Sequence, residues 1–262
     1  MNDTESVRST TAARVRIITL NRPAALNAMN NAMFAGVADA LRAAEQADDT
    51  AVTVITGAGR AFCAGQDLTE MQAMLDGSGN VHEFPRMLEA LTNFSKPLLA
   101  AVNGLGVGIG MTLLAHCDLV FMADDAKLRT PFPQLGLAPE AGSSITFAER
   151  MGWQNAAYAL LSGRWFSADE CRDLGLVWRV IPAPALMDET LAVAHELAAN
   201  PIPSLVATKR LMLDGGRPAR ALAAHEREMQ IYAELLGAPA NREAVRAFAE
   251  KRTPDFSAIP GV

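Results

Sequence analysis

The 262-residue sequence lacks the motifs that identify several large classes of enzyme. It has no Walker A phosphate loop, no G-x-S-x-G nucleophile elbow and no H-E-x-x-H zinc motif. Every second position of residues 104–110 (GLGVGIG) is glycine, and this spacing differs from the dinucleotide-binding G-x-G-x-x-G. The four histidines are dispersed, and we expect no metal site. His82, His195 and His225, each followed by a glutamate, are predicted to be solvated.

Cysteine and positive charge are also scarce. The three cysteines, an odd number, give no disulfide framework and fit a reducing compartment. A net charge of −6 argues against nucleic acid or an anionic membrane as the main partner. Residues 1–11 are polar and contain no apolar segment of a secretory signal. The longest apolar stretch, residues 97–123, includes Asn103, His116 and Asp118, so it predicts a strand, a turn and a buried helix rather than a membrane span. We expect a cytoplasmic protein.

What the sequence does have is the pattern of a globular α/β protein. Half of its residues are apolar and 20% are charged, which is typical of a chain with a sizeable core. A helix is predicted over residues 30–46, where Met33, Phe34, Val37 and Leu41 recur at helical spacing. Alternating strands and helices favour largely parallel pairing. The predicted strands are residues 14–20, 51–56, 98–102 and 119–122.

The strand signals stop after about residue 184, and only helical stretches follow. Prolines and paired glycines separate these stretches. We therefore predict two units: a core over residues 12–184 and a C-terminal helical subdomain over residues 185–262. The predicted helices of the second unit are residues 185–199, 204–213, 219–236 and 242–251.

Three short segments carry chemistry. Residues 62–68 (FCAGQDL) and 103–110 (NGLGVGIG) are glycine-containing turns that each follow an apolar strand. Backbone N–H groups at such turns can point into a site instead of closing a sheet ladder. Residues 139–142 (PEAG) place one carboxylate, Glu140, in an apolar loop flanked by glycine. Two backbone donors and one base are the minimum needed to form and collapse an enolate.

These segments, taken with several others in order, resemble the crotonase (enoyl-CoA hydratase/isomerase) superfamily. The resemblance runs from about residue 12 to about residue 253. It implies a spiral of ββα units, an acyl-CoA thioester substrate with no separate cofactor, and a helical tail that forms the surface of a homotrimer or of a dimer of trimers. The further segments that carry it are residues 20–29 (LNRPAALNAM), 56–61 (TGAGRA), 100–104 (AAVNG), 117–119 (CDL), 175–177 (GLV) and 247–252 (AFAEKR).

The resemblance also assigns the catalytic groups. The backbone N–H groups of Gln66 and Ile109 fall at the positions of the two oxyanion donors. Hydratases of the family carry two glutamates, and the corresponding positions here hold Thr112 and Phe132. Glu140 instead falls at the position of the lone carboxylate of Δ3,Δ2-enoyl-CoA isomerases.

Glu140 also has a purely structural interpretation. It could be an acid in the first turn of a helix over residues 141–151, an end that favours negative charge. As a base, it would have Phe132 and Phe147 as apolar neighbours, which would raise its pKa and exclude water.

Residues for the coenzyme A moiety and the acyl chain follow from the resemblance as well. They are Arg22, Ala24 and Leu26 beside the pantetheine and phosphates, Ala64, Asp67 and Leu68 around the adenine, and Phe132, Phe248 and Lys251. A neighbouring subunit is expected to supply Phe248 and Lys251. By charge alone, Arg22 and Lys251 fit phosphate contacts and solubilising surface positions equally well.

The sequence thus predicts an isomerase that moves the double bond of a 3-enoyl-CoA to the 2-position, as in the β-oxidation of fatty acids. Two alternatives stay open. One is other enolate chemistry of the same superfamily, either hydratase-like or that of an aromatic-catabolism CoA isomerase. The other is a non-catalytic module that binds acyl-CoA, in which a base at position 140 would have no purpose.

Overall fold

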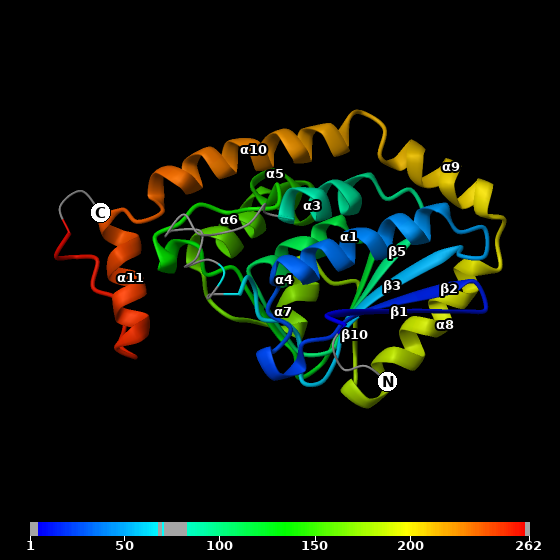
Figure 1. The fold of residues 1–262 in the computed structure, drawn as a ribbon, viewed down its shortest axis with the longest axis horizontal. Helices are drawn as coiled ribbons and strands as arrows, with labels where there is room; N and C mark the ends of the chain where they lie inside the picture. Colours follow the sequence, from blue (N-terminus) through cyan, green and yellow to red (C-terminus); the bar gives the residue numbers. More distant parts are fainter. Residues whose placement is uncertain (1–4, 68–69, 71–82, 260–262) are drawn as a thin grey trace.

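The computed structural model describes residues 5–67, 70 and 83–259 of the chain. Its main sheet has six strands in the order β1-β2-β3-β5-β7-β10 (Figure 1). Only β1 is antiparallel to its neighbour, and the other pairs are parallel. The strands are β1 (Val7–Ala12), β2 (Val15–Leu20), β3 (Val52–Gly57), β5 (Leu98–Val102), β7 (Leu119–Ala123) and β10 (Arg179–Ile181).

A second, smaller sheet has the order β4-β6-β8-β9. Its first three strands are parallel and β9 is antiparallel. Along the chain a strand of the large sheet is followed three times by a strand of the small one: β3 by β4, β5 by β6 and β7 by β8. This repetition confirms the predicted spiral of ββα units. The strands are β4 (Ala61–Cys63), β6 (Leu105–Val107), β8 (Lys127–Arg129) and β9 (Phe166–Ser167).

The predicted first helix is α1 (Asn31–Gln46). Asn30 precedes it, and the Asn30 side chain accepts a hydrogen bond from the Met33 N–H, as expected of an N-cap. The other helices that the structure describes before residue 184 include α3 (Phe84–Asn93), α4 (Ile109–Thr112), α5 (Ser143–Met151), α6 (Trp153–Ser162) and α7 (Ala168–Asp173). Short 3₁₀ turns are η1 (Pro23–Ala25), η2 (Leu113–His116) and η3 (Pro133–Leu135), with η4 (Ala183–Ala185) just at the junction.

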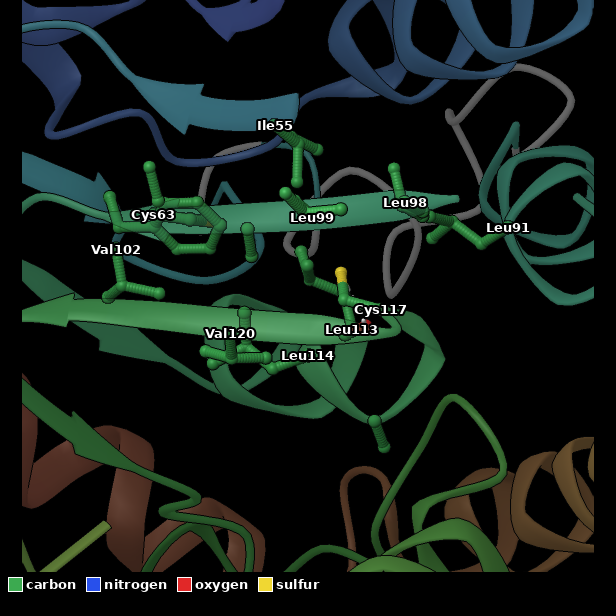
Figure 2. Packing of buried hydrophobic residues seen from close by; sticks show 14 of the residues in the cluster. Ile55, Cys63, Leu91, Leu98, Leu99, Val102, Leu113, Leu114, Cys117 and Val120 are labelled. Atoms are coloured by element: carbon green, nitrogen blue, oxygen red, sulfur yellow. Dashed lines mark hydrogen bonds between the residues drawn. The ribbon is translucent and has the colours of Figure 1, made fainter. Parts of the chain in front are cut away.

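The core lies between the strands of the large sheet and the helices that cover it. Figure 2 shows Ile55 of β3, Leu99 of β5 and Val120 of β7 on neighbouring strands of this sheet, and all three are fully buried. The three cysteines are buried with free thiols, and burial raises the pKa of Cys117 to about 12. A thiol with so high a pKa is a poor nucleophile, so these cysteines are core residues.

The C-terminal helices cover both sides of the core. They are α8 (Leu186–Ala198), α9 (Ile202–Met212), α10 (Arg217–Leu235) and α11 (Pro239–Ala249). Helix α8 contacts the large sheet, whereas α10 runs across α5 and α3 on the other side of the molecule (Figure 1). Helix α11 lies against η3, where the Asn241 Nδ2 donates to the Leu135 carbonyl at 2.8 Å.

The tail therefore packs on the core of its own chain, a contact that the sequence had not predicted. Only helices follow β10 within residues 183–259. The division into two units near residue 184 stays a prediction. None of the helices in the described ranges is long and apolar enough to cross a membrane.

Two features differ from the sequence-based expectation. The polar N-terminal stretch forms β1, an edge strand with five of its six residues exposed. His225 was predicted to be solvated, but it is buried, with its ring 5.1 Å from that of Phe84. His195 is exposed, and His82 lies outside the described residues.

Candidate active site

The two glycine turns lie side by side because their strands pair. In the parallel pair β4–β6, Cys63 is opposite Gly106. A Cβ on Gly110 would come 2.3 Å from the Cys63 carbonyl oxygen, so only glycine allows the second turn to approach the first strand. Gly65 has a φ of +100°, and a Cβ there would lie 3.1 Å from the Val107 carbonyl oxygen. The packing of the two turns therefore depends on glycine on both sides.

The turn at Gln66 is held by the segment that precedes α1. The Met29 N–H donates to the Gly65 carbonyl at 2.7 Å, and the Asp67 N–H donates to the Met29 carbonyl at 2.9 Å. These two bonds form a parallel bridge between Met29 and Gln66. The backbone at position 66 is thus fixed from both sides, as a preorganised donor requires.

The second predicted donor, the Ile109 N–H, is the first of helix α4. The N–H groups of Met111 and Thr112 both bond to the Gly108 carbonyl, at 2.8 and 2.9 Å. Within residues 5–67, 70 and 83–259, no acceptor is bonded to the Ile109 N–H. An N–H at the start of a helix has no partner inside that helix, so it can serve a ligand.

Glu140 lies in the loop between η3 and α5, where it is partly buried. The Thr112 hydroxyl donates to its Oε1 at 3.1 Å. Thr112 stands one helical turn after Ile109, so the same short helix carries a predicted oxyanion donor and the anchor of the carboxylate. Burial raises the pKa of Glu140 to about 8, the hydrogen bond from Thr112 opposes the rise, and the charge of Glu228 adds to it.

The structural interpretation of Glu140 as an acid in the first turn of a helix is wrong. Helix α5 begins at Ser143 after Gly142, and its first turn contains no acidic residue. The carboxylate at this helix end comes instead from Glu228 of α10. Its oxygens accept from the Gly142 N–H at 2.7 Å and from the Ser144 N–H at 2.8 Å.

The two positions that hold glutamate in hydratases have different surroundings here. Thr112 is fully buried and contacts Glu140 through its hydroxyl. Phe132 is 6% exposed and stands at the start of η3. Phe147, the other predicted apolar neighbour of Glu140, is buried in α5. Neither position 112 nor position 132 supplies a carboxylate.

Most of the residues predicted to contact coenzyme A gather near the first turn. Arg22 forms an ion pair with Asp67, Nη1 to Oδ2 at 2.9 Å. The Ala64 N–H donates to the Leu26 carbonyl at 3.0 Å. Ala24 is exposed in η1 beside them. Leu68 lies outside the described residues.

Two further residues predicted to contact coenzyme A, Phe248 and Lys251, lie at the C-terminal end of the described chain. Phe248 belongs to α11, but its side chain is outside the described part of the structure. Lys251 is exposed just after the helix, with a φ of +54°. Their contacts with coenzyme A, and their origin from a neighbouring subunit, stay predictions.

Three residues around these turns were missed by the sequence-based reasoning. Asn27 is buried at a φ of +57°, and its Nδ2 donates to the carbonyls of Ala58 and Ala61, which joins the Arg22 segment to β4. His116 and Glu228 hold the backbone that follows Glu140. Local sequence patterns do not distinguish Glu228 from a solvated helix residue, because it is the packing of α10 that buries it together with Ala221 and Ala224.

No group of three or more His, Cys, Asp or Glu side chains gathers as a metal site among the residues that the structure describes.

Comparison with known proteins identifies the family of the chain. The family model described as enoyl-CoA hydratase/isomerase matches residues 10–258. The chain is 36% identical to 2,3-dehydroadipyl-CoA hydratase of Escherichia coli K12, over 93% of this chain and 95% of that one. It is 33% identical to 1,2-epoxyphenylacetyl-CoA isomerase of the same organism, with the same coverage. The crystal structure of an enoyl-CoA hydratase/isomerase from Pseudoalteromonas atlantica T6c superposes with a TM-score of 0.89 at 35% identity, over 96% of this chain and 99% of that one. The chain therefore belongs to the enoyl-CoA hydratase/isomerase family and is an enzyme of the crotonase superfamily.

Proposed function

We propose that this enzyme is an acyl-CoA isomerase that converts a 3-enoyl-CoA into the 2-enoyl-CoA. The observation that carries the proposal is the carboxylate of Glu140, which is bonded to the short helix that begins with a predicted N–H donor, whereas Asp67 of the first turn is paired with Arg22. Glu140 is partly buried and has a pKa of about 8. Its carboxylate accepts a hydrogen bond from Thr112, and Thr112 occupies a position at which hydratases of the family carry a glutamate. Shifting a double bond needs one base that removes a proton and returns it elsewhere, and one carboxylate meets that need.

In the proposed reaction the ionised Glu140 removes a proton from C2 of the substrate. The electron pair moves onto the thioester oxygen and gives a dienolate, which the N–H groups of Gln66 and Ile109 stabilise. The protonated Glu140 then returns the same proton to C4, and the double bond comes to lie between C2 and C3. No water, electron or cofactor is consumed, and coenzyme A enters only as part of the substrate.

The raised pKa suits both halves of this transfer. A carboxylate with an ordinary pKa near 4.5 would be a weak base toward a carbon acid, whereas one near 8 holds the proton more firmly before passing it on. The hydrogen bond from Thr112 fixes the carboxylate in place and lowers its basicity slightly. The buried neighbourhood also keeps water away from the alkene.

Hydration has less support from the residues, although a relative at 36% identity is named a hydratase. Syn addition of water in the family uses two glutamates, and Thr112 and Phe132 occupy those positions here. Neither side chain can act as a general base toward water near neutral pH.

A second candidate is the isomerisation of an epoxide of an aromatic acyl-CoA. It is favoured by the relative named 1,2-epoxyphenylacetyl-CoA isomerase, which matches nearly the full length of both chains. The same base and the same two N–H donors would serve, and the shape of the acyl pocket would decide between the substrates.

The proposal is tested with 3-hexenoyl-CoA and 2-hexenoyl-CoA, by following conjugation and hydration separately. We expect conjugation to be much faster than hydration. Glu140→Gln should lower turnover by roughly 10²–10⁴ while the Kd for the acyl-CoA stays nearly unchanged, since the oxyanion donors remain. The matched control is Glu226→Gln, an exposed glutamate of α10. Near wild-type isomerase activity in the Glu140 variant, or hydration as fast as conjugation, would refute the assignment.

Assembly and location are part of the proposal. We infer a homotrimer, or a dimer of trimers, in the cytoplasm. Exposed apolar side chains on the tail, such as Ile231 at 47%, support further burial by a second copy. Sedimentation as a monomer at micromolar concentration would exclude this assembly.

A further inference from the structure

The backbone that follows Glu140 has an unusual conformation. Ala141 has a φ of +61° and Gly142 a φ of +70°, so two consecutive residues lie in the left-handed region. A side chain at position 141 makes this conformation unfavourable unless the surroundings fix it. The direction in which Glu140 leaves the loop depends on these two residues.

Two buried side chains from distant parts of the chain hold this turn. The His116 Nε2 lies 2.9 Å from the Ala141 carbonyl oxygen, and because that oxygen can only accept, Nε2 carries the hydrogen. Glu228 is 5% exposed, and both of its oxygens accept backbone N–H groups, those of Gly142 and Ser144. Such charge-assisted hydrogen bonds are stronger than neutral ones.

A residue within the turn could not replace Glu228. An N-cap side chain at position 142 would need a Cβ, and that atom would lie 2.6 Å from the Ala221 carbonyl oxygen of α10. The same close approach brings α10 near enough for Glu228 to reach the N–H groups. The carboxylate that holds the loop therefore comes from Glu228 of α10, which is 88 residues further along the chain than Glu140.

We propose that Glu228 is a positioning residue, which holds the turn at residues 141–144 and thereby keeps the Glu140 carboxylate against Thr112. The proposal rests on the proposed role of Glu140 as the base. Glu228 touches no reacting atom in it, and it acts only through the backbone next to Glu140.

The charge of Glu228 gives a second consequence that can be measured. It is one of the causes that raise the pKa of Glu140, so its removal should lower that pKa. The other groups around the two carboxylates are Thr112 of α4, Cys63 of β4, His116 of η2, and His225 and Tyr232 of α10. Burial keeps the pKa of His116 low, at about 4, and raises that of Cys63 and of Tyr232 to about 12. None of these three changes charge between pH 5 and pH 10.

The test uses two variants of the full-length enzyme and one control. Glu228→Gln removes the charge and leaves only one oxygen to accept from the two N–H groups, whereas Glu228→Asp keeps the charge but draws it back by one methylene. Glu226→Gln changes the charge of the same helix at an exposed position. Circular dichroism checks that each folds, and Glu228→Asp carries the test if Glu228→Gln does not fold.

We expect Glu228→Gln to lower kcat by about tenfold or more with a nearly unchanged KM, because small displacements of a catalytic group are costly. The midpoint of its kcat–pH profile should fall below that of the wild type. Glu228→Asp should lose part of kcat and keep the midpoint. Hydrogen exchange of peptides that cover residues 141–148 should be faster in Glu228→Gln than in Glu226→Gln.

A further comparison separates this proposal from the assignment of the base. Adding Glu228→Gln to Glu140→Gln should cause no further loss, since the residue acts through Glu140. If Glu140→Gln stays active, the proposed function fails and the positioning role falls with it. If Glu140→Gln is inactive but Glu228→Gln matches Glu226→Gln in kcat and midpoint, only the positioning role is refuted.

Discussion

The pKa of Glu140 predicts an unusual dependence of stability on pH. A glutamate has a pKa of about 4.5 in the unfolded chain and about 8 in the folded protein, mainly because of burial. Between these two values the folded state holds a proton that the unfolded state has released. The free energy of unfolding therefore contains a favourable contribution that is fully present below pH 4.5 and is lost as the pH rises to 8.

The size of this contribution follows from the two pKa values. At about 1.4 kcal/mol for each tenfold change, the ionised form of Glu140 destabilises the fold by about 5 kcal/mol above pH 8, and about 3–4 kcal/mol of this develops between pH 5 and pH 8. Glutamine at position 140 has no proton to lose. As the pH rises from 5 to 8, the free energy of unfolding of Glu140→Gln should therefore increase by about 3–4 kcal/mol relative to that of the wild type, because the two proteins share all other titrating groups.

The assay is urea unfolding, followed by circular dichroism at pH 5, 6.5 and 8 for the wild type, Glu140→Gln and the exposed control Glu226→Gln. The control should follow the wild type to within about 0.5 kcal/mol at each pH. A difference between Glu140→Gln and the wild type that is the same at every pH would show that Glu140 titrates normally. Glu140 would then be an ordinary carboxylate and a weak base toward a carbon acid.

Two further predictions concern the same pair of turns. Thr112→Val removes the hydrogen bond that opposes the rise in the pKa of Glu140. The midpoint of the kcat–pH profile should therefore move upward, and kcat at pH 7 should fall several-fold. An unmoved midpoint would show that this hydrogen bond has no electrostatic effect on Glu140. Gly110→Ala places a Cβ 2.3 Å from the Cys63 carbonyl oxygen, and the resulting strain should destabilise the fold by about 1–3 kcal/mol and reduce turnover. Unfolding in urea and initial rates measure these effects, and a fully active variant of wild-type stability would contradict the close packing of the turns.

The sequence was sufficient to predict the long elements. Helix α1 followed from the spacing of its apolar residues, and four strands of the large sheet followed from their continuous apolar runs. Strands as short as β9, with two residues, have no period to detect, and they form only because neighbouring strands offer them a partner. Strand β1 escaped detection because an exposed edge strand needs no apolar face.

The supports of the candidate site were beyond the reach of local patterns. His225 and Glu228 are polar residues on a helix, and such residues are usually solvated. Their burial results from the packing of α10 onto α5 and α3, which brings together residues far apart in the sequence.

Helix α4 links the proposed base to one of the proposed oxyanion donors. Ile109 and Thr112 are the first and last residues of this one-turn helix, and Glu140 is bonded to the second of them. A displacement of α4 would move the Ile109 N–H directly and would pull on the Glu140 carboxylate through its hydrogen bond to Thr112. It would also change the distance between α4 and the turn at Gln66. The close approach of Gly110 to Cys63 is thus one of the contacts on which the alignment of the proposed site depends, because it sets how α4 sits against β4.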